Sequence, residues 1–312
     1  MKVIVVSGPT ACGKTKISID LAEKFNAEVV NFDSLLLYQE ISIGTAKPTP
    51  HEMRGIPHHM VSVASISEPL NASQYANQAL PIIENILKRG KNVILTGGSG
   101  FYLQALLKGM YDSPTTPAEI IKRSDDLYRA EGIGPFIEIL KISDLPSFKM
   151  YHENDHYRIR RAVEHFWTHG TPLSSVRTQK EEENQTLEKG NIHNWEVLHI
   201  YLNIPREEHF EIIQNRTRLM LQDGLLDEVR ALLNSKFTGL EKPLQSIGYK
   251  ESLEYIRGEI TSVEELMEKI NISTRQLAKA QRTWFNRDKD KFEFHPLSQR
   301  NEIFEKMSEF LK

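Results

Sequence analysis

"VIVVSGPTACGKTKISIDLA", residues 3–22, begins as a short apolar run, turns at a glycine and places a lysine and a hydroxyl where a helix should begin. Its centre satisfies the pattern G-x-x-x-x-G-K-[ST], between an expected strand and an expected helix. Glycines let backbone N–H groups close around oxyanions, and a helix N-terminus adds partial positive charge. The sequence therefore predicts a phosphate-binding loop of the nucleotide-binding type, made of Gly8, Pro9, Thr10, Ala11, Cys12, Gly13, Lys14 and Thr15.

Three side chains of this loop carry possible chemistry. We expect the Lys14 ammonium to reach the terminal phosphate of a ligand, and the Thr15 hydroxyl to offer an oxygen to Mg²⁺. Cys12 could be a reactive thiol, because a helix N-terminus lowers the pKa of a thiol. It could equally be a small residue that fits a tight turn, and we favour this second interpretation.

The sequence lacks the second acid of a phosphoryl-transfer site. Such a site needs a carboxylate for Mg²⁺, usually at the end of another buried strand, but the expected strand Asn92–Thr96 leads into Gly97-Gly98-Ser99-Gly100. The acid at a strand end is Asp33, in "AEVVNFDS". The pocket therefore suits a diphosphate as leaving group and carbon as electrophile. Asp33 could take a proton from the nucleophile, or it could cap a helix over Ser34–Tyr38.

Strand and helix patterns alternate along the first 110 residues, after which a charged, helical segment follows. We expect an α/β fold, a P-loop NTPase-like parallel sheet flanked by helices on both faces, with a mostly helical insertion. The catalytic core is expected over residues 1–112 and 192–312 and the insertion over 113–191. The expected strands are Lys2–Ser7, 27–34, Asn92–Thr96 and 195–204, and the expected helices are Lys14–Phe25, Ala72–Arg89, Arg206–Leu233, Leu266–Asp288 and Glu302–Lys312.

Composition excludes several classes of protein. Of the 312 residues, 39% are hydrophobic and 26% charged, as in globular domains. Apolar runs are too short for a membrane span or a signal peptide, so we expect a cytoplasmic protein. One cysteine cannot form an internal disulfide or a cysteine-rich zinc site. The net charge of −3 gives no global attraction to nucleic acid, but local basic clusters can still bind phosphates.

Two expected helices carry basic stripes, one at residues 157–166 and the other at residues 274–285. Either stripe alone is usually a solvated face, but two stripes beside a phosphate pocket favour an anionic polymer as partner. The basic residues are Arg158, Arg161 and His165 in the first helix and Arg275, Lys279 and Arg282 in the second. The first helix would be anchored by an apolar stripe of Ile159, Ala162, Val163 and Phe166.

Two further features have alternative interpretations. Arg216 lies beside an apolar stripe of Phe210, Ile213, Thr217 and Met220, and it could clamp a diphosphate or pair with a helix glutamate. The paired histidines in "IPHHM" could suggest a metal. Because adjacent residues of an extended chain point to opposite faces, we expect no metal there.

An ordered set of motifs covers nearly the whole chain. It comprises "SGPTACGKT", "NFDSLLLYQEISIGTAKPT", "GIPHHM", "LTGGSGFYLQALLKG", "YRIRRAVE", "RLMLQDGLLDEV", "QSIGYKE" and "TRQLAKAQRTWF". In this order the set resembles the tRNA dimethylallyltransferases of the bacterial type. The resemblance implies transfer of a dimethylallyl group from dimethylallyl diphosphate to the N6 amine of adenosine 37 in tRNA, with Mg²⁺ as cofactor.

The same resemblance assigns roles to residues. Asp33 would be the general base, Thr10 to Thr15 the diphosphate cradle with Lys14 in it, and Ser99 and Arg216 further clamps. The insertion would grip the anticodon stem. The tRNA-contacting positions would be Asp33, Ser34, Leu35, Leu36, Ser99, Arg123, Tyr157, Arg158, Ile159, Arg160, Arg161, Gln245, Ser246, Ile247, Gly248, Tyr249 and Lys250. The second basic stripe, rather than the resemblance, adds Arg275, Lys279 and Arg282 to these candidates.

This chain departs from the family pattern at several positions. Cys12 replaces a usual serine and Ser99 a common threonine, and Ile212 replaces an arginine often found one turn before Arg216, which would weaken the clamp. Arg123 is the nearest candidate for an expected tRNA-contacting arginine. Three alternatives remain: an adenylate prenyltransferase, a P-loop nucleotide kinase and a non-catalytic tRNA-binding protein. We expect a monomer.

Overall fold

The computed structural model describes residues 1–109, 116–177 and 193–312. The chain divides into two compact units, which we call unit 1 (Met1–Leu107 with His193–Lys312) and unit 2 (Lys108–Ile192). Within the described residues, no helix is long and apolar enough to cross a membrane.

A six-stranded sheet lies at the centre of unit 1, and every pairing in it is parallel, in the order β3-β2-β4-β1-β5-β6. This confirms the expected fold class. The sheet contains two short strands, β3 and β6, that the sequence analysis missed. The strands are β1 (Lys2–Ser7), β2 (Ala27–Asn31), β3 (His58–His59), β4 (Asn92–Gly97), β5 (Glu196–Leu202) and β6 (Phe292–Phe294).

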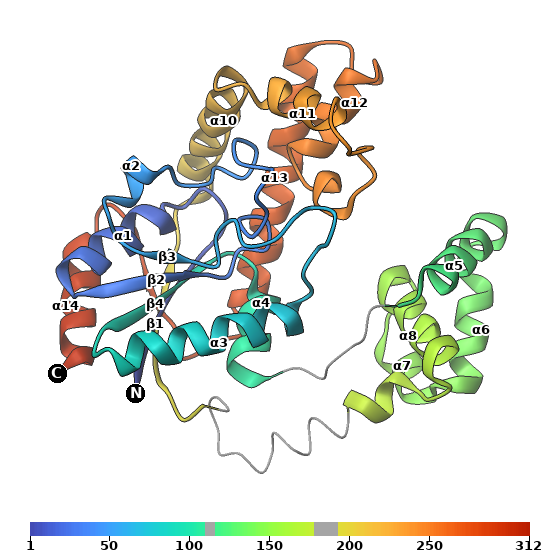
Figure 1. Cartoon of the computed structure of the whole chain (residues 1–312), viewed down its shortest axis with the longest axis horizontal. Coiled ribbons are helices and arrows are strands. Elements are labelled where there is room, and N and C mark those ends of the chain that lie inside the picture. Colours follow the sequence, from blue (N-terminus) through green and yellow to red (C-terminus); the bar gives the residue numbers. More distant parts are fainter. Residues whose placement is uncertain (110–115, 178–192) are drawn as a thin grey trace. The chain divides into compact units, whose positions relative to one another are not determined.

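Helices cover both faces of this sheet (Figure 1). Because both faces are covered, the central strands are continuous apolar runs, and Val3 to Val6 in β1 have no exposed surface. Helices α3 (Ala72–Lys88) and α4 (Gly100–Lys108), with the end of α13 (Val263–Phe285), pack on one face. Helices α1 (Lys14–Lys24) and α14 (Arg300–Leu311) pack on the other. A short helix, α2 (Pro50–Met53), precedes β3.

A second apolar cluster joins the C-terminal helices of unit 1 to the segment after β2. The helix expected over Arg206–Leu233 is two helices, because Gly224 adopts φ 98° and caps the second. Helix α13 begins three residues earlier than expected, where the Ser262 side chain accepts the Glu265 N–H. The helices of this layer are α10 (Arg206–Gln222), α11 (Leu225–Leu233), the 3₁₀ helix η1 (Lys242–Gln245), α12 (Tyr249–Ile256) and α13.

Unit 2 is helical in its described part and has its own apolar core. Ile159, Ala162 and Val163 of the expected apolar stripe are buried in that core, while Phe166 is half-buried. The expected break at "SPTTP" and the charged run "TQKEEENQTLEKG" lie largely outside the described residues. The labelled helices are α5 (Ala118–Glu131), α6 (Gly134–Ser143), α7 (Leu145–Met150) and α8 (His156–His169).

The parallel sheet determines where the candidate site lies. All six strands end at the same edge, so the segments that follow β1, β2 and β4 are neighbours there. These segments carry the phosphate loop, Asp33 and Ser99, respectively.

Candidate active site

The phosphate loop connects β1 to α1 in a strained conformation. Ala11 adopts φ 64° and Gly13 φ 85°, both in the left-handed region. The Lys14 ammonium folds back over the loop and donates to the carbonyl oxygens of Gly8 and Pro9, at 3.1 and 2.8 Å. Because carbonyl oxygens carry no formal charge, this arrangement leaves the lysine charge uncompensated beside the helix N-terminus.

Cys12 is buried beneath the loop, and burial raises the pKa of its thiol. A Cβ added to Gly8 would lie 2.7 Å from the Cys12 Sγ, so the two residues pack closely. These observations support the interpretation of Cys12 as a small packing residue.

Asp33 lies two residues beyond the end of β2, in a tight turn. The Asn31 side chain holds that turn, because it accepts the Asp33 N–H at 2.8 Å and donates to the Asp33 carbonyl at 3.0 Å. One Asp33 carboxylate oxygen accepts the Leu35 N–H at 3.1 Å. The alternative of a helix over Ser34–Tyr38 is wrong, since residues 34–37 form bends and turns and Tyr38 forms an isolated β-bridge with Ala64.

Ser99 connects the segments that follow β2 and β4. Its hydroxyl accepts the Ser34 N–H at 3.0 Å and lies 3.2 Å from the Ser34 hydroxyl. The other oxygen of Asp33 faces the same strand end, 3.5 Å from the position of a Cβ built on Gly98. Asp33, Ser34 and Ser99 therefore form one cluster.

Arg216 approaches from α10 and is half-buried. Its guanidinium donates to the Thr45 carbonyl at 3.4 Å. Burial lowers its pKa, and the nearby Asp33 charge opposes that shift. In the described parts of the chain Arg216 forms no ion pair with a carboxylate, so the expected alternative of a helix glutamate is not observed.

Two residues that the sequence analysis gave no function contact the phosphate loop at Thr10. Gln281 of α13 accepts the Thr10 N–H, and His209 of α10 contacts the Thr10 carbonyl. A signal for His209 was present, because His209, Ile213, Thr217 and Met220 are the buried residues of α10. The expected stripe began one residue later, at Phe210, which is exposed.

A buried chain of polar groups lies just before the loop. The Ser7 hydroxyl is 2.6 Å from the His199 Nε2, and the His199 Nδ1 is 2.5 Å from an Asp288 carboxylate oxygen. This hydrogen bond to His199 lowers the pKa of Asp288. Because Ser7 has no exposed surface, the chain links β1, β5 and the end of α13 but offers no accessible nucleophile.

The C-terminal candidates for tRNA contact differ in exposure. Tyr249 is buried, and its hydroxyl donates to Glu228 and accepts the Gly44 N–H. Arg282 is half-buried behind the phosphate loop. Lys250 and Lys279 are exposed, as is Gln245, while Ser246 and Ile247 are half-buried and Gly248 is buried.

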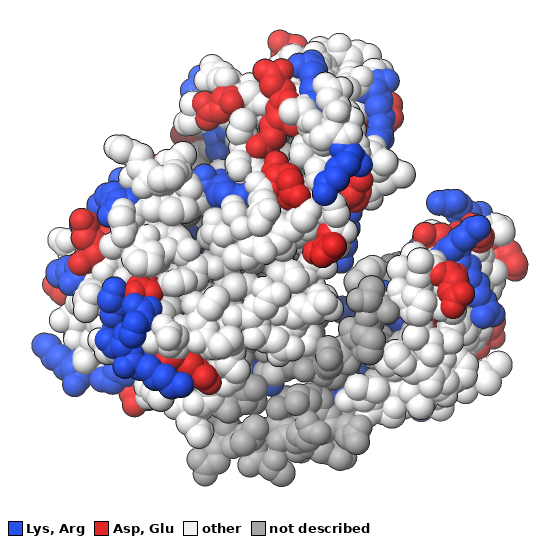
Figure 2. All heavy atoms as spheres, viewed as in Figure 1, with Lys and Arg blue, Asp and Glu red and all other residues white. Residues whose placement is uncertain are grey.

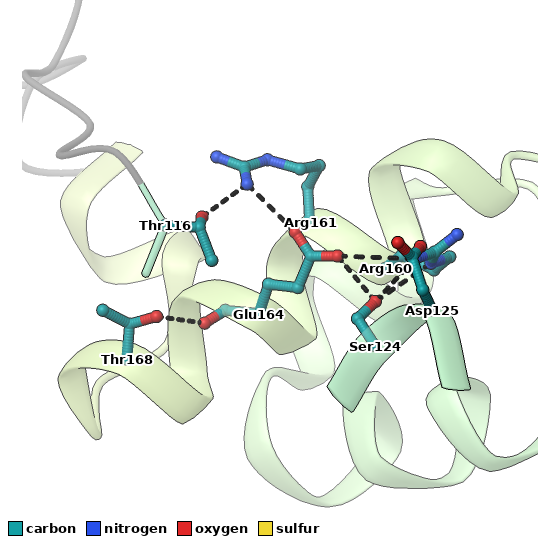
Figure 3. Close-up of polar contacts among 7 residues, drawn as sticks. All are labelled: Thr116, Ser124, Asp125, Arg160, Arg161, Glu164 and Thr168. Carbon is teal, nitrogen blue, oxygen red and sulfur yellow. Dashed lines mark hydrogen bonds and ion pairs between the residues drawn. The ribbon is translucent and has the colours of Figure 1, made fainter. Parts of the chain in front are cut away.

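Arginines of the predicted tRNA segment in unit 2 are paired with acids (Figure 3). Arg160 donates to Asp125 at 2.5 Å and to Ser124, and Arg161 donates to Glu164 at 2.9 Å and to Thr116. Glu164 is buried, so its carboxylate joins the two arginines inside the unit.

Other basic side chains of unit 2 are more accessible. Arg158 is 59% exposed, with an ion pair to Asp155, and Tyr157 beside it is 67% exposed. Arg123 is exposed and lies 4.0 Å from the centroid of the Trp167 ring. On the face shown in Figure 2, basic and acidic side chains of this unit are interspersed.

The paired histidines form strand β3 and have separate partners. The His58 Nδ1 is 2.8 Å from the Ile56 carbonyl, and the His59 Nε2 is 2.8 Å from Glu28. Among the described residues, no cluster of three or more His, Cys, Asp or Glu side chains could hold a metal ion.

Comparisons with known proteins converge on one family. The family model described as IPP transferase matches residues 36–288. The chain is 36% identical over 288 residues to tRNA dimethylallyltransferase 2 of Geotalea uraniireducens, covering 92% of this chain and 90% of the relative. It is 37% identical over 290 residues to tRNA dimethylallyltransferase 1 of Citrifermentans bemidjiense, covering 93% and 90%.

Solved structures give the same result. The full-length tRNA isopentenylpyrophosphate transferase of Bacillus halodurans is 28% identical, with a TM-score of 0.71, and the alignment covers 99% of this chain and 96% of that protein. A eukaryotic dimethylallyltransferase whose structures show it acting on tRNA is 29% identical, with a TM-score of 0.77 and coverage of 98% and 77%.

Proposed function

Because the chain belongs to the IPP transferase family and is a tRNA prenyltransferase, we propose that it transfers a dimethylallyl group from dimethylallyl diphosphate to the N6 amine of adenosine 37 in tRNA. The products are N6-(dimethylallyl)adenosine and diphosphate. One observation carries this proposal: the phosphate loop, Asp33 and Ser99 follow the parallel neighbours β1, β2 and β4 at one edge of the sheet.

The loop and two cations would hold the diphosphate. Lys14 and Arg216 are hydrogen-bonded to carbonyl oxygens, so neither side chain must break an ion pair before it binds an anion. The Ser99 hydroxyl and the N–H groups of the loop supply further donors. Preorganised donors of this kind stabilise the charge that develops on the leaving group. Ile212 packs partly against the core near α1 and α14, so Arg216 would act without a second arginine one turn before it.

The residues present fit Mg²⁺ bound together with a substrate phosphate. Mg²⁺ takes oxygen ligands and commonly uses one or two protein groups plus phosphate oxygens and water. The exposed Thr15 hydroxyl is such a group, in the first turn of α1. When bound, Mg²⁺ would supply charge neutralisation on the diphosphate.

Asp33 would act as the general base. The N6 lone pair attacks C1 of the donor, the C1–O bond breaks with its electrons going to the diphosphate, and Asp33 accepts the proton that nitrogen loses. An exocyclic amine is a weak nucleophile because its lone pair is delocalised into the ring. It therefore needs the base and the electrophile held together, and the turn made by Asn31 fixes the position of Asp33.

Unit 2 would grip the anticodon stem. Its accessible basic side chains, Arg123 and Arg158, suit phosphates, and exposed Tyr157 suits contact with a nucleoside. The target base must leave its stack to reach Asp33, which costs less in a loop than in a duplex. We propose that the enzyme acts as a monomer.

A transfer assay tests this function. The enzyme is incubated with Mg²⁺, dimethylallyl diphosphate labelled in the prenyl group, and either unmodified tRNA or AMP. We expect label in tRNA, at adenosine 37 after nuclease mapping, and none in AMP. Label in AMP alone would identify an adenylate prenyltransferase, and tRNA binding without transfer of label would contradict the catalytic assignment.

A further inference from the structure

The two peptide groups that flank Thr10 are each held by a side chain from the C-terminal third of the chain. The Thr10 N–H donates to the Gln281 Oε1 at 2.7 Å, and the Thr10 carbonyl oxygen is 2.8 Å from the His209 Nε2. His209 has no exposed surface, and Gln281 is buried. A loop expected to bind its ligand through backbone N–H groups thus has two successive peptide groups fixed, the one before Thr10 by α13 and the one after it by α10.

The partners of His209 determine which of its nitrogens carries the proton. The Arg282 guanidinium, which can only donate, lies 2.7 Å from the His209 Nδ1. Nδ1 is therefore the acceptor, and the Nε2–H donates to the Thr10 carbonyl. Arg282 also lies 3.3 Å from Asn203 Oδ1 and from the Ile204 carbonyl, which ties it to the end of β5.

Gln281 extends the contact to the neighbouring strand. With its Oε1 occupied by Thr10, its Nε2 donates to the Gly98 carbonyl at 3.0 Å. The fit is tight, because a Cβ on Gly98 would lie only 2.4 Å from that nitrogen. One amide group thus sets the spacing between the phosphate loop and the segment that carries Ser99.

The contacts of Gln281 and His209 with Thr10 lie just before the strained part of the loop. Ala11, the next residue, has φ 64°, a conformation that a non-glycine residue keeps only where its surroundings impose it. The peptide group between Thr10 and Ala11 has its carbonyl held by His209, and its orientation determines where the N–H groups from Ala11 to Lys14 begin to point.

We propose that His209 and Gln281 are positioning residues that hold the phosphate loop in its diphosphate-binding conformation. The proposal rests on the diphosphate role of the loop in the proposed function. Both side chains act through the peptide groups that flank Thr10 rather than on the reacting atoms. Their loss should therefore weaken binding of diphosphate and of the prenyl donor, while affinity for tRNA stays unchanged.

Two substitutions of His209 distinguish its hydrogen bond to the Thr10 carbonyl from its hydrogen bond with Arg282. His209→Gln keeps an N–H donor near the position of Nε2, whereas His209→Asn keeps an acceptor near Nδ1 but is too short to reach Thr10. We expect His209→Asn to raise the Kd for inorganic diphosphate and the KM for the donor about tenfold or more, as loss of a partner for a buried polar group implies. His209→Gln should stay within about threefold of the unchanged protein.

The measurements are calorimetric titration with inorganic diphosphate, and initial transfer rates at varied donor and varied tRNA. Gln281→Met should likewise raise the Kd for diphosphate. Thr217→Val is the matched control and should change neither constant, because Thr217 is buried on the same face of α10 and its hydroxyl donates to the Ile213 carbonyl of its own helix. Equal effects of His209→Asn and His209→Gln, or an effect on kcat alone, would overturn the proposal.

The calorimetric arm separates this proposal from the proposed function. Diphosphate binding needs no prenyl transfer, so it can be measured even if the unchanged enzyme modifies no tRNA. If the unchanged enzyme binds diphosphate and His209→Asn binds it equally well, the positioning role is wrong while the transfer reaction stands or falls on its own assay.

Discussion

Two cations near the phosphate loop and three arginines of α8 in unit 2 are held by different kinds of partner. Lys14 and Arg216 donate to carbonyl oxygens, whereas Arg158, Arg160 and Arg161 donate to carboxylates. A carbonyl orients a cation without adding a negative charge, whereas a carboxylate offsets part of the cation's charge. Lys and Arg residues in a sequence therefore do not by themselves predict a basic surface. Whether such a side chain attracts an anion also depends on the group to which it is already hydrogen-bonded. The same difference ranks the substitutions below, from the largest expected effect to the smallest.

Removing the negative charge of Asp33, at the sheet edge that carries the phosphate loop, should have the largest effect on the reaction. Asp33→Asn keeps an oxygen to accept the Leu35 N–H, so the turn should persist, but the amide cannot take a proton. We expect turnover to fall by roughly 10²–10⁴, the usual contribution of a general base, with tRNA affinity unchanged. Steady-state rates and a tRNA binding titration measure both, and unchanged turnover would remove Asp33 from the mechanism.

Removing a cation that is hydrogen-bonded to carbonyl oxygens should give the next largest loss. Lys14→Met or Arg216→Met should weaken diphosphate binding about tenfold to a hundredfold, because hydrogen bonds to charged groups are worth about 1.5–3 kcal/mol. Lys16→Met makes the same charge change at an exposed position of α1 and should bind diphosphate normally. Calorimetry compares the three, and an equal loss in Lys16→Met would indicate only a general charge effect.

Removing cations that are paired with acids should have a smaller effect. We expect Arg158→Gln with Arg161→Gln to weaken tRNA binding and to reduce the slope of log K against log salt by about one for each phosphate that the variant no longer neutralises. Diphosphate binding should not change. Arg129→Gln, at an exposed position of α5 outside the predicted segment, is the control. If the double variant keeps the full salt slope, these arginines do not contact the tRNA backbone.

The smallest effect concerns stability and pH. Burial lowers the pKa of His58, His165 and His209 below the ordinary value of 6.5. Near and below pH 6.5 the unfolded chain therefore binds more protons at these histidines than the folded chain does. Their contribution to the free energy of unfolding is complete above that pH and is lost as the pH falls through it. The melting temperature should fall as the pH is lowered from 7.5 to 5.5. It should fall less in the His209→Gln variant, which has lost one of the three buried rings. A flat profile would contradict the buried, neutral state of these rings.

Sequence reasoning found the features that depend on local spacing. Gly8–Thr15, the acid at the end of β2 and the strand–helix alternation all follow from residues close together in the chain. Gln281 and His209 were missed as partners of Thr10 because 271 and 199 residues separate them from it. No local pattern reports a contact of that range.

Other differences have equally physical causes. Strands β3 and β6 contain two and three residues, too few to show a period. The break at Gly224 lies in an apolar pattern that continues across it, so a single long helix was expected. The acids that pair with Arg160 include Asp125 on another helix, which the sequence of α8 alone does not reveal.

The most direct test of the central claim is to follow both halves of the donor. Dimethylallyl diphosphate carrying one label in the prenyl carbons and another in the phosphorus is incubated with the enzyme and unmodified tRNA. The carbon label should enter tRNA while all of the phosphorus label is released as diphosphate. Phosphorus label in tRNA would show phosphoryl transfer and would contradict the assignment of the loop as a holder of the leaving group.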